Sequence, residues 1–137
     1  MSWNWLSTTF LLLTIMLLGC GHDQQLVSIN VEPQTETFGS DTTPVSADAG
    51  ANVQLRALGT FIHPPVTKDI TDQVIWSSNT PQMVTVNSTG LITATGLACG
   101  NTLISATVKT NKSSGGLSSS GAIVTGTMTA NVTCPKS

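Results

Sequence analysis

The stretch from Val74 to Thr95 constrains the fold more than any other part of the chain. It contains three short runs in which apolar and polar residues alternate: Val74 to Ser77, Met83 to Asn87 and Leu91 to Thr95. Two groups of turn-forming residues divide these runs, namely Ser78 to Pro81 and Ser88 to Gly90. Alternation with a period of two is typical of strands that bury one face. The stretch therefore predicts three successive β-strands packed around Trp76.

Alternating runs before and after this stretch extend the pattern. They lie at Leu26 to Val31, Ala51 to Phe61, Thr102 to Lys109 and Ala122 to Val132. Beyond residue 25 the sequence shows no helical period, so seven or eight short strands predict an all-β, antiparallel β-sandwich. The predicted core residues, which share the inward faces of the runs, are Val74, Trp76, Leu55, Ala57, Val86, Ile104 and Ala106.

Three further predictions concern the segments around these runs. Residues 51–61 form one unbroken strand in this interpretation, and it ends where two prolines follow His63, because proline cannot donate to a ladder. Residues 67–72 are interpreted as a turn that leads into Val74. The polar segment 34–50 has no convincing period, and Pro44 to Ala47 is its best candidate for a second piece of the first strand.

The N-terminus has the features of a secretory signal peptide. Leu6 to Leu18 is an almost unbroken apolar run, shorter than the roughly 20 residues of a transmembrane helix. It ends in Leu17-Leu18-Gly19-Cys20, which resembles the bacterial lipobox, where the cysteine becomes lipid-modified and N-terminal. The first five residues depart from the usual pattern because they include no Lys or Arg. A buried N-terminal helix is the alternative, although the run offers no polar face.

We therefore predict a lipoprotein signal peptide over residues 1–19, a short lipidated tether over residues 20–25 and one domain over residues 26–137. Acylated Cys20 would anchor the protein to a membrane that the chain does not cross. Five tether residues span at most about 20 Å, so the domain would lie close to the bilayer, at the extracytoplasmic side of a bacterial envelope. Gly21 rather than Asp follows the cysteine, which favours the outer membrane in a Gram-negative host.

Lipidation of Cys20 would leave one pair of cysteines, Cys99 and Cys134. They lie at the same end of two strands that we expect to be antiparallel neighbours, so a disulfide is predicted in an oxidising envelope. Two reduced thiols are the alternative. If Cys99 lay directly opposite Cys134, even-numbered residues of one strand would face odd-numbered residues of the other. The predicted inward residues, however, are even-numbered on both strands. We therefore predict a one-residue offset, produced by a bulge near Ala98 to Gly100.

Composition and motifs exclude several classes of function. Net charge is −2 and the five cationic residues are scattered, so we expect no nucleic-acid partner. Catalytic motifs and glycine-rich phosphate loops are missing, and we predict no enzyme activity, no metal and no cofactor. His63 is interpreted as an exposed loop residue rather than a ligand or base. The acids interpreted as solvated loop residues, rather than calcium ligands, are Asp41, Asp48, Asp69 and Asp72.

Several stretches together resemble the bacterial immunoglobulin-like domains of group 2 (Big2), which occur in intimin- and invasin-type adhesins and in many envelope proteins. In chain order they are Val53 to Ala57, Asp69 to Thr71, Val74 to Asn79, Met83 to Val86, Gly90 to Ala94 and Ile104 to Thr107. The resemblance covers about Leu26 to Cys134. It implies an Ig-like sandwich that acts as an extracytoplasmic binding or spacer module without catalysis. Two loops, at residues 40–49 and 111–121, are longer than in the family. We interpret them as tolerated insertions, and local elaborations of function are the alternative.

Two functions follow as hypotheses. The first is a non-catalytic, lipid-anchored Ig-like module of the cell envelope, in surface or cell-wall association or protein–protein interaction, with an envelope protein or a glycan as partner. The second is a lipoprotein that binds a small ligand or a carbohydrate through the loops 40–49 and 111–121. Few exposed aromatic side chains are available for sugar stacking, because we expect Trp76 to lie in the core rather than to form a platform.

Overall fold

The computed structural model describes residues 24–109 and 123–136. Its strands are β1 (Gln25–Glu32), β2 (Thr35–Phe38), β3 (Asn52–Gln54), β4 (Arg56–Ile62), β5 (Val66–Asp69), β6 (Ile75–Ser78), β7 (Val84–Val86), β8 (Leu91–Ala94), β9 (Gly100–Lys109) and β10 (Ile123–Val132). A short 3-10 helix, η1 (Val45–Asp48), lies between β2 and β3. The predicted signal peptide, Cys20 and the 111–121 loop lie outside the described residues.

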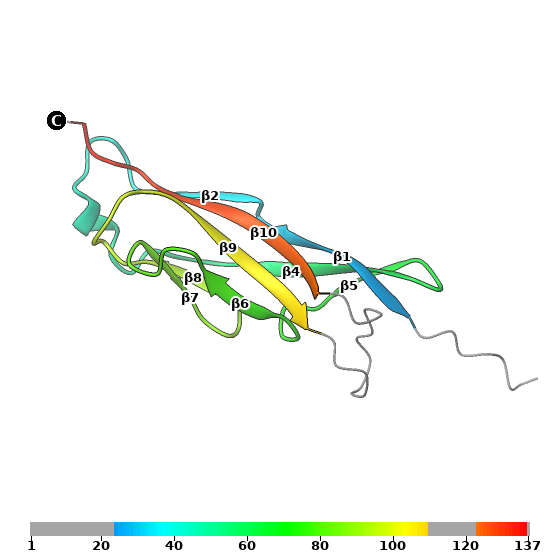
Figure 1. Cartoon of the computed structure of the whole chain (residues 1–137). Helices are drawn as coiled ribbons and strands as arrows, with labels where there is room; N and C mark the ends of the chain where they lie inside the picture. Colours follow the sequence, from blue (N-terminus) through cyan, green and yellow to red (C-terminus); the bar gives the residue numbers. More distant parts are fainter. Residues whose placement is uncertain (1–23, 110–122, 137) are drawn as a thin grey trace, which may run out of the picture.

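The strands form a sandwich of two layers (Figure 1). One layer is the four-stranded sheet β2-β10-β9-β6, and the other contains the three-stranded sheets β1-β4-β5 and β3-β8-β7. The two smaller sheets belong together because only Leu55 separates β3 from β4. If β1 with β2, and β3 with β4, are counted as the halves of two bent strands, the described residues contain eight strands. The predicted all-β, Ig-like sandwich of seven to eight strands is confirmed.

The prediction of one unbroken strand over residues 51–61 is wrong. The hydrogen-bonding partner changes at Leu55, because β3 pairs with β8 whereas β4 pairs with β1 and β5. At the break, Leu55 donates its N–H to the carbonyl oxygen of Gly90 at 2.9 Å. The alternation of buried side chains continues through the break, with Leu55 and Ala57 both buried. A change of partner strand therefore left no trace in the sequence pattern.

Two strands lie where the sequence predicted none. The second piece of the first strand is β2, which runs parallel to β10 with Phe38 beside Val132. The predicted piece at Pro44 to Ala47 instead leads into η1. The predicted turn at residues 67–72 begins with β5, which forms a hairpin with β4 and has His63 at its tip. Both are edge strands with mostly exposed side chains, so neither produces an alternating signal.

The core lies between the two layers. Six of the predicted core residues are buried in it, namely Val74, Trp76, Leu55, Ala57, Ile104 and Ala106. Val86 differs from the prediction because it is only half-buried and packs against the core from its margin. In β9 and β10 the inward residues are even-numbered, as expected, with Ile104 opposite Met128.

The backbones of β1 and β10 approach closely at Gly126. A Cβ atom at this position would lie 2.9 Å from the carbonyl carbon of Ile29, and closer still to the carbonyl oxygen. Strand β1 of one layer therefore packs directly on the main chain of β10 in the other. Glycine is required here because any side chain would occupy the space of the Ile29 peptide group.

We expect Gly126→Ala to destabilise the domain by about 1–3 kcal/mol, because the new methyl group must displace the backbone of β1. Chemical denaturation of both proteins measures the difference. The matched control is Thr127→Ala, which truncates an exposed side chain on the same strand and should change stability by less than about 0.5 kcal/mol. Equal stability of Gly126→Ala and the unchanged protein would contradict this packing.

Candidate functional site

Trp76, at the centre of the stretch that predicted the fold, is a core residue. It is 9% exposed, and its indole Nε1 donates to the carbonyl oxygen of Thr71 at 3.1 Å. Gly90 packs against the ring with φ +83, and a Cβ atom there would lie 2.9 Å from two ring carbons. A ring that is buried and hydrogen-bonded in this way is not a platform for sugar stacking.

Thr71 connects the two layers of the sandwich. Its hydroxyl oxygen accepts the N–H of Ala57 in β4 at 2.9 Å, and its carbonyl oxygen accepts the indole N–H of Trp76 in β6. Ala57 is fully buried. If the Thr71 hydroxyl were removed, the N–H of Ala57 would lose its acceptor and no water molecule could replace it. One residue in the turn between β5 and β6 thus satisfies a donor from each layer.

Asp69, at the end of β5, holds Thr71 in position. Its Oδ1 accepts the N–H of Thr71 at 3.0 Å and the hydroxyl of Thr71 at 2.5 Å. Its Oδ2 accepts the Nε–H of Arg56 at 3.1 Å in an exposed ion pair. The hydrogen bonds from Thr71 and, to a smaller extent, the Arg56 guanidinium hold the pKa of Asp69 below its ordinary value. Asp69 is exposed to solvent, as predicted, but it ends β5 rather than lying in a loop, and its carboxylate is also a structural acceptor.

Asn87 shapes the turn between β7 and β8 in a similar way. Its Oδ1 accepts the N–H groups of Thr89 and Leu91, both at 3.0 Å, and the hydroxyl of Thr89 at 2.8 Å. Asp69 and Asn87 each bond to a threonine two residues further on, a local pattern that asparagine and aspartate side chains favour in turns. That spacing, Asp-x-Thr and Asn-x-Thr, is the sequence signal that could have identified both residues as structural.

An open polar groove lies where β3 passes into β4. It encloses about 460 Å³ and is lined by Gln54, Leu55, Arg56, Asp69, Thr71, Asp72, Gln73 and Thr89. Several of its polar groups already form hydrogen bonds or ion pairs with other residues of the domain. Gln54 Nε2 donates to the carbonyl oxygen of Thr89 at 2.6 Å, and Arg56 pairs with Asp69. The lining contains no histidine, cysteine or lysine. The Thr71 hydroxyl beside Asp69 is already engaged, because it donates to that carboxylate and accepts the N–H of Ala57. No residue of the 40–49 segment lines the groove.

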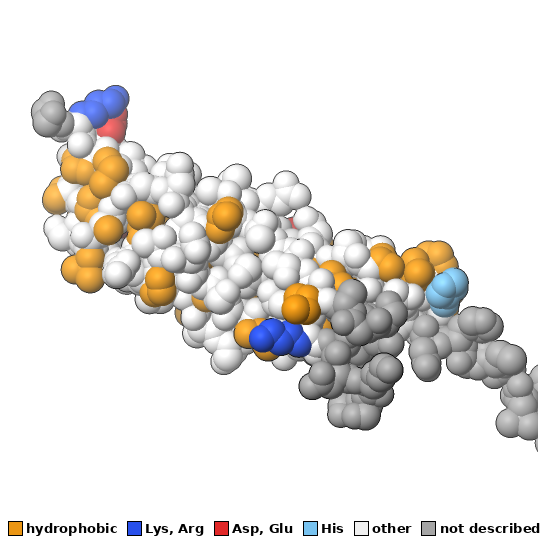
Figure 2. All heavy atoms as spheres, viewed as in Figure 1, with side chains coloured by type: hydrophobic (Ala, Val, Ile, Leu, Met, Phe, Trp, Pro, Cys, Tyr) orange, Lys and Arg blue, Asp and Glu red, His pale blue; other side chains and the backbone are white. Residues whose placement is uncertain are grey.

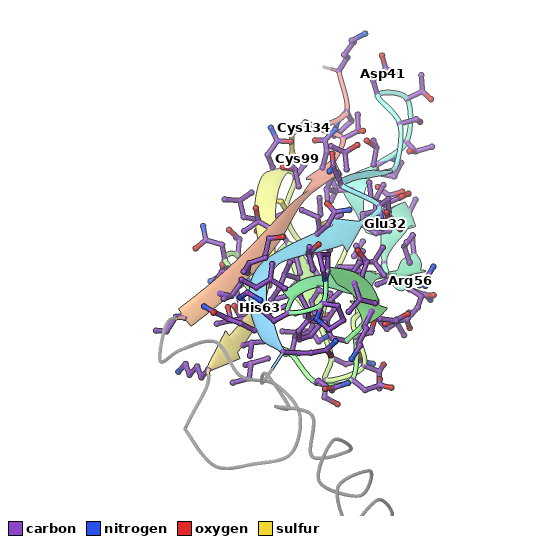
Figure 3. All side chains as sticks on the ribbon, turned by 90° about the vertical axis from the view of Figure 1, so that its right-hand side faces the viewer. Glu32, Asp41, Arg56, His63, Cys99 and Cys134 are labelled. Carbon is purple, nitrogen blue, oxygen red and sulfur yellow. A yellow bond between two sulfur atoms is a disulfide. The ribbon has the colours of Figure 1, made fainter. Side chains whose placement is uncertain are left out.

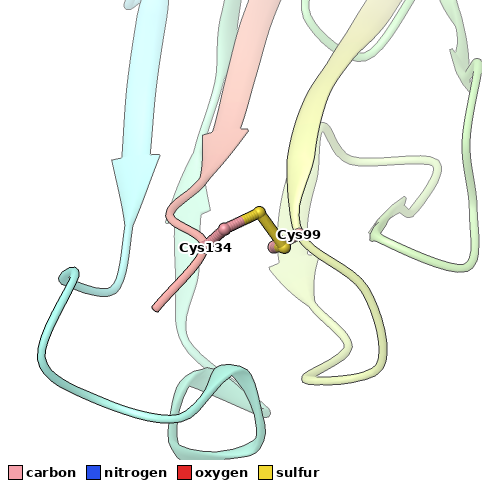
Figure 4. The surroundings of a disulfide bond; sticks show 2 residues. All are labelled: Cys99 and Cys134. Atoms are coloured by element: carbon pink, nitrogen blue, oxygen red, sulfur yellow. A yellow bond between two sulfur atoms is a disulfide. The ribbon is translucent and has the colours of Figure 1, made fainter. Parts of the chain in front are cut away.

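A disulfide joins Cys99 to Cys134, with the Cα atoms 5.2 Å apart (Figure 4). The ladder between β9 and β10 is regular up to Gly100, which lies opposite Val132. The bridge is therefore offset by one residue from this register, as predicted. No bulge interrupts the ladder itself, because the shift occurs just beyond its last pair, next to Gly100, the first residue of β9, which has φ +128.

The two ends of the sandwich carry different features (Figures 1 and 3). The disulfide lies at the same end as Asp41 and η1, whereas His63 lies at the tip of the β4–β5 hairpin at the other end. Lys136 ties the C-terminal residues to Asp41 through an ion pair of 2.5 Å and a backbone hydrogen bond of 2.9 Å. Strand β9 ends, and β10 begins, on the side away from residues 40–49. The 111–121 loop itself lies outside the described residues.

The outer face of the four-stranded sheet is almost uncharged. By register, its outward residues are Thr35, Thr37, Ile75, Ser77, Asn101, Leu103, Ser105, Thr107, Lys109, Ile123, Thr125, Thr127, Thr129 and Asn131. Only Lys109 in this set is charged, and Figure 2 shows the face largely free of charged side chains. Hydroxyl groups bond across the strands, Ser77 to Ser105 at 2.7 Å and Thr107 to Thr125 at 3.1 Å. Depletion of charge is a property of protein–protein contact surfaces.

Within residues 24–109 and 123–136, no group of three His, Cys, Asp or Glu side chains is arranged to hold a metal ion. Over the same residues, no helix is long and apolar enough to cross a membrane.

The family model of the bacterial Ig-like domain (group 2) matches residues 35–116, more than half of the chain. The chain belongs to this family. No curated protein matches the sequence. Domains of the family are typically non-catalytic modules of extracellular bacterial proteins. In this Ig-like domain the matched range includes Trp76 and the Asp69–Thr71 turn, which carry the resemblance, and both serve the fold.

We expect Thr71→Val to destabilise the Ig-like domain by about 1–3 kcal/mol, because the buried N–H of Ala57 loses its acceptor while the side-chain volume is kept. Equilibrium unfolding in denaturant measures the loss. Thr67→Val makes the same chemical change at an exposed position of β5 and should be nearly neutral. Similar effects of the two substitutions would contradict the role of Thr71.

The lowered pKa of Asp69 predicts a pH dependence. A carboxyl group whose pKa is lower in the folded state stabilises the fold above its unfolded pKa, and the stabilisation is lost as pH falls through the folded value. We therefore expect stability to fall on acidification through and below the ordinary pKa of 3.8. Asp69→Asn should show a smaller fall, measured as the denaturation midpoint against pH. Arg56→Gln should alter the profile less than Thr71→Val, and an unchanged profile in Asp69→Asn would refute the assignment.

Proposed function

We propose that this Ig-like domain is a non-catalytic interaction module of the bacterial cell envelope, attached to the membrane by lipid on Cys20. The pairing of the cysteines carries the proposal. The chain contains three cysteines, and the disulfide uses Cys99 and Cys134. The remaining cysteine is the one that ends the apolar run in a lipobox-like sequence.

The direction in which the chain leaves the domain supports this attachment. Gln24, the first described residue, accepts a hydrogen bond from Lys68 Nζ of β5 through its side-chain oxygen. The chain thus enters at the hairpin end, away from the disulfide. Lipid on Cys20 would direct the disulfide end away from the membrane, together with residues 40–49 and the side chain of Leu97, which is 80% exposed. Gly21 after the cysteine favours the outer membrane in a Gram-negative host.

A protein is the partner that the surface chemistry favours. The aromatic residues in the described part of the chain, Phe38, Phe61 and Trp76, are all buried, so none is available to stack on a sugar ring. The uncharged outer face of the four-stranded sheet loses little solvation on contact, because it carries almost no ionised groups. We propose that this face, rather than the polar groove, meets an envelope protein.

The attachment predicts a specific N-terminus. When the full chain is expressed in a bacterium that acylates lipoproteins, mass spectrometry should find an N-terminal peptide that begins with acylated Cys20. Cys20→Ser should lack the acyl groups and retain residues 1–19.

The matched control is the double variant Cys99→Ser with Cys134→Ser. It removes the disulfide and should keep the acylated N-terminus, because neither cysteine takes part in processing. An unmodified Cys20, or an intact Met1, in the unchanged protein would overturn the proposal.

A further inference from the structure

The β4–β5 hairpin projects at the end where the chain enters the domain (Figures 1 and 3). Its tip consists of His63, Pro64 and Pro65, all exposed, and half-buried Ile62 and Val66 flank the tip. His63 adopts φ +67, which turns the chain between the two strands. Such a tip presents apolar rings and aliphatic side chains to whatever lies beyond it.

A β-bulge in β1 adds another apolar side chain at the same end. The ladder pairs Leu26 with Phe61 and Ser28 with Thr60, so Val27 has no partner across the ladder and is 44% exposed. Figure 2 shows hydrophobic side chains beside the histidine at this end. Lys68 adds a positive charge, with its Nζ 5.3 Å from the centre of the Phe61 ring. We call Val27, Ile62, Pro64, Pro65, Val66 and Lys68 the hairpin-end surface.

The length of the chain limits the distance between this surface and a lipid on Cys20. Gln24 forms a hydrogen bond with Lys68 and lies four residues after Cys20 in the sequence. Four residues span at most about 14 Å when fully extended. The acylated cysteine lies in the membrane surface, so the hairpin end must stay near the lipid headgroups.

We propose that the hairpin-end surface is a second membrane contact, which rests among the lipid headgroups and fixes the orientation of the domain on the bilayer. This proposal rests on the anchor at Cys20. An apolar surface of this size binds a bilayer weakly alone, but the anchor keeps it at high effective concentration beside the membrane. Anionic lipid should strengthen the contact about fivefold through Lys68.

Site-specific labelling of the full acylated protein tests the contact. Cys20 is acylated and Cys99 is bonded to Cys134, so an introduced cysteine provides a single reactive thiol. Pro65→Cys labels the hairpin tip, and Thr42→Cys labels the disulfide end as the matched control. Each protein carries an environment-sensitive fluorophore in phosphatidylcholine vesicles that contain phosphatidylglycerol and a nitroxide-labelled lipid. We expect a blue-shifted, quenched emission at position 65 and a water-like, unquenched emission at position 42.

A substitution at a second position of the hairpin-end surface shows whether the surface itself, rather than the label, makes the contact. Val27→Asp should weaken the quenching at position 65 about fivefold, because it replaces an apolar contact with a charge that anionic lipid repels. Leu97→Asp makes the same kind of change at the other end and should leave the quenching unchanged. Unaltered thermal unfolding shows that both variants fold.

The outcomes separate the two proposals. Acylated protein that floats with vesicles but gives water-like emission at position 65 overturns the membrane contact and leaves the anchor intact. If the unchanged protein carries no acyl groups and fails to float with vesicles, the anchor is overturned, and the membrane contact with it.

Discussion

Both layers of this Ig-like domain depend on hydrogen bonds made by the turn Asp69–Thr71. Thr71 accepts the N–H of Ala57 from one layer and the indole N–H of Trp76 from the other. Ile70 donates its N–H to the carbonyl oxygen of Ala57 at 2.8 Å and is itself buried, so the turn satisfies both backbone groups of Ala57. Because unpaired buried donors cost more than the hydrogen bond gains, the turn cannot open without weakening the contact between the layers.

This arrangement explains why the residues that carry the family resemblance reveal little about which partner the domain binds. The side chains of Asp69, Thr71, Trp76 and Asn87 are all engaged in hydrogen bonds within the domain itself. The features that distinguish this chain lie at its two ends. One end carries the disulfide and the exposed Leu97, and the other carries the hairpin tip and the point where the chain enters. An anchor at Cys20 would make these the outward and the membrane-facing ends.

The sequence predicted which faces are buried but not which strands are neighbours. Alternation identified the inward residues from Leu55 to Ala106 because side-chain period follows burial. It could not detect the change of partner at Leu55, which leaves that side chain in the core. Strands β2 and β5 were missed because each has only four residues with mostly exposed side chains, which is too few buried positions to produce a period. Val86 was placed too deep because it shares the period of β7 but ends that strand at the margin of the core. The structural role of Asp69 was missed because it depends on the hydroxyl of Thr71, two residues further along the chain.

Native-state hydrogen exchange tests the central claim most directly, because it reports how far the protein must unfold before a given N–H is exposed. If the Thr71 turn holds the layers together, the indole N–H of Trp76 and the amide of Ala57 should exchange only through global unfolding. Their exchange free energies should then equal that of the Ala106 amide in the central strand β9. Exchange of the Trp76 and Ala57 protons by a local opening, far faster than that of Ala106, would contradict the account.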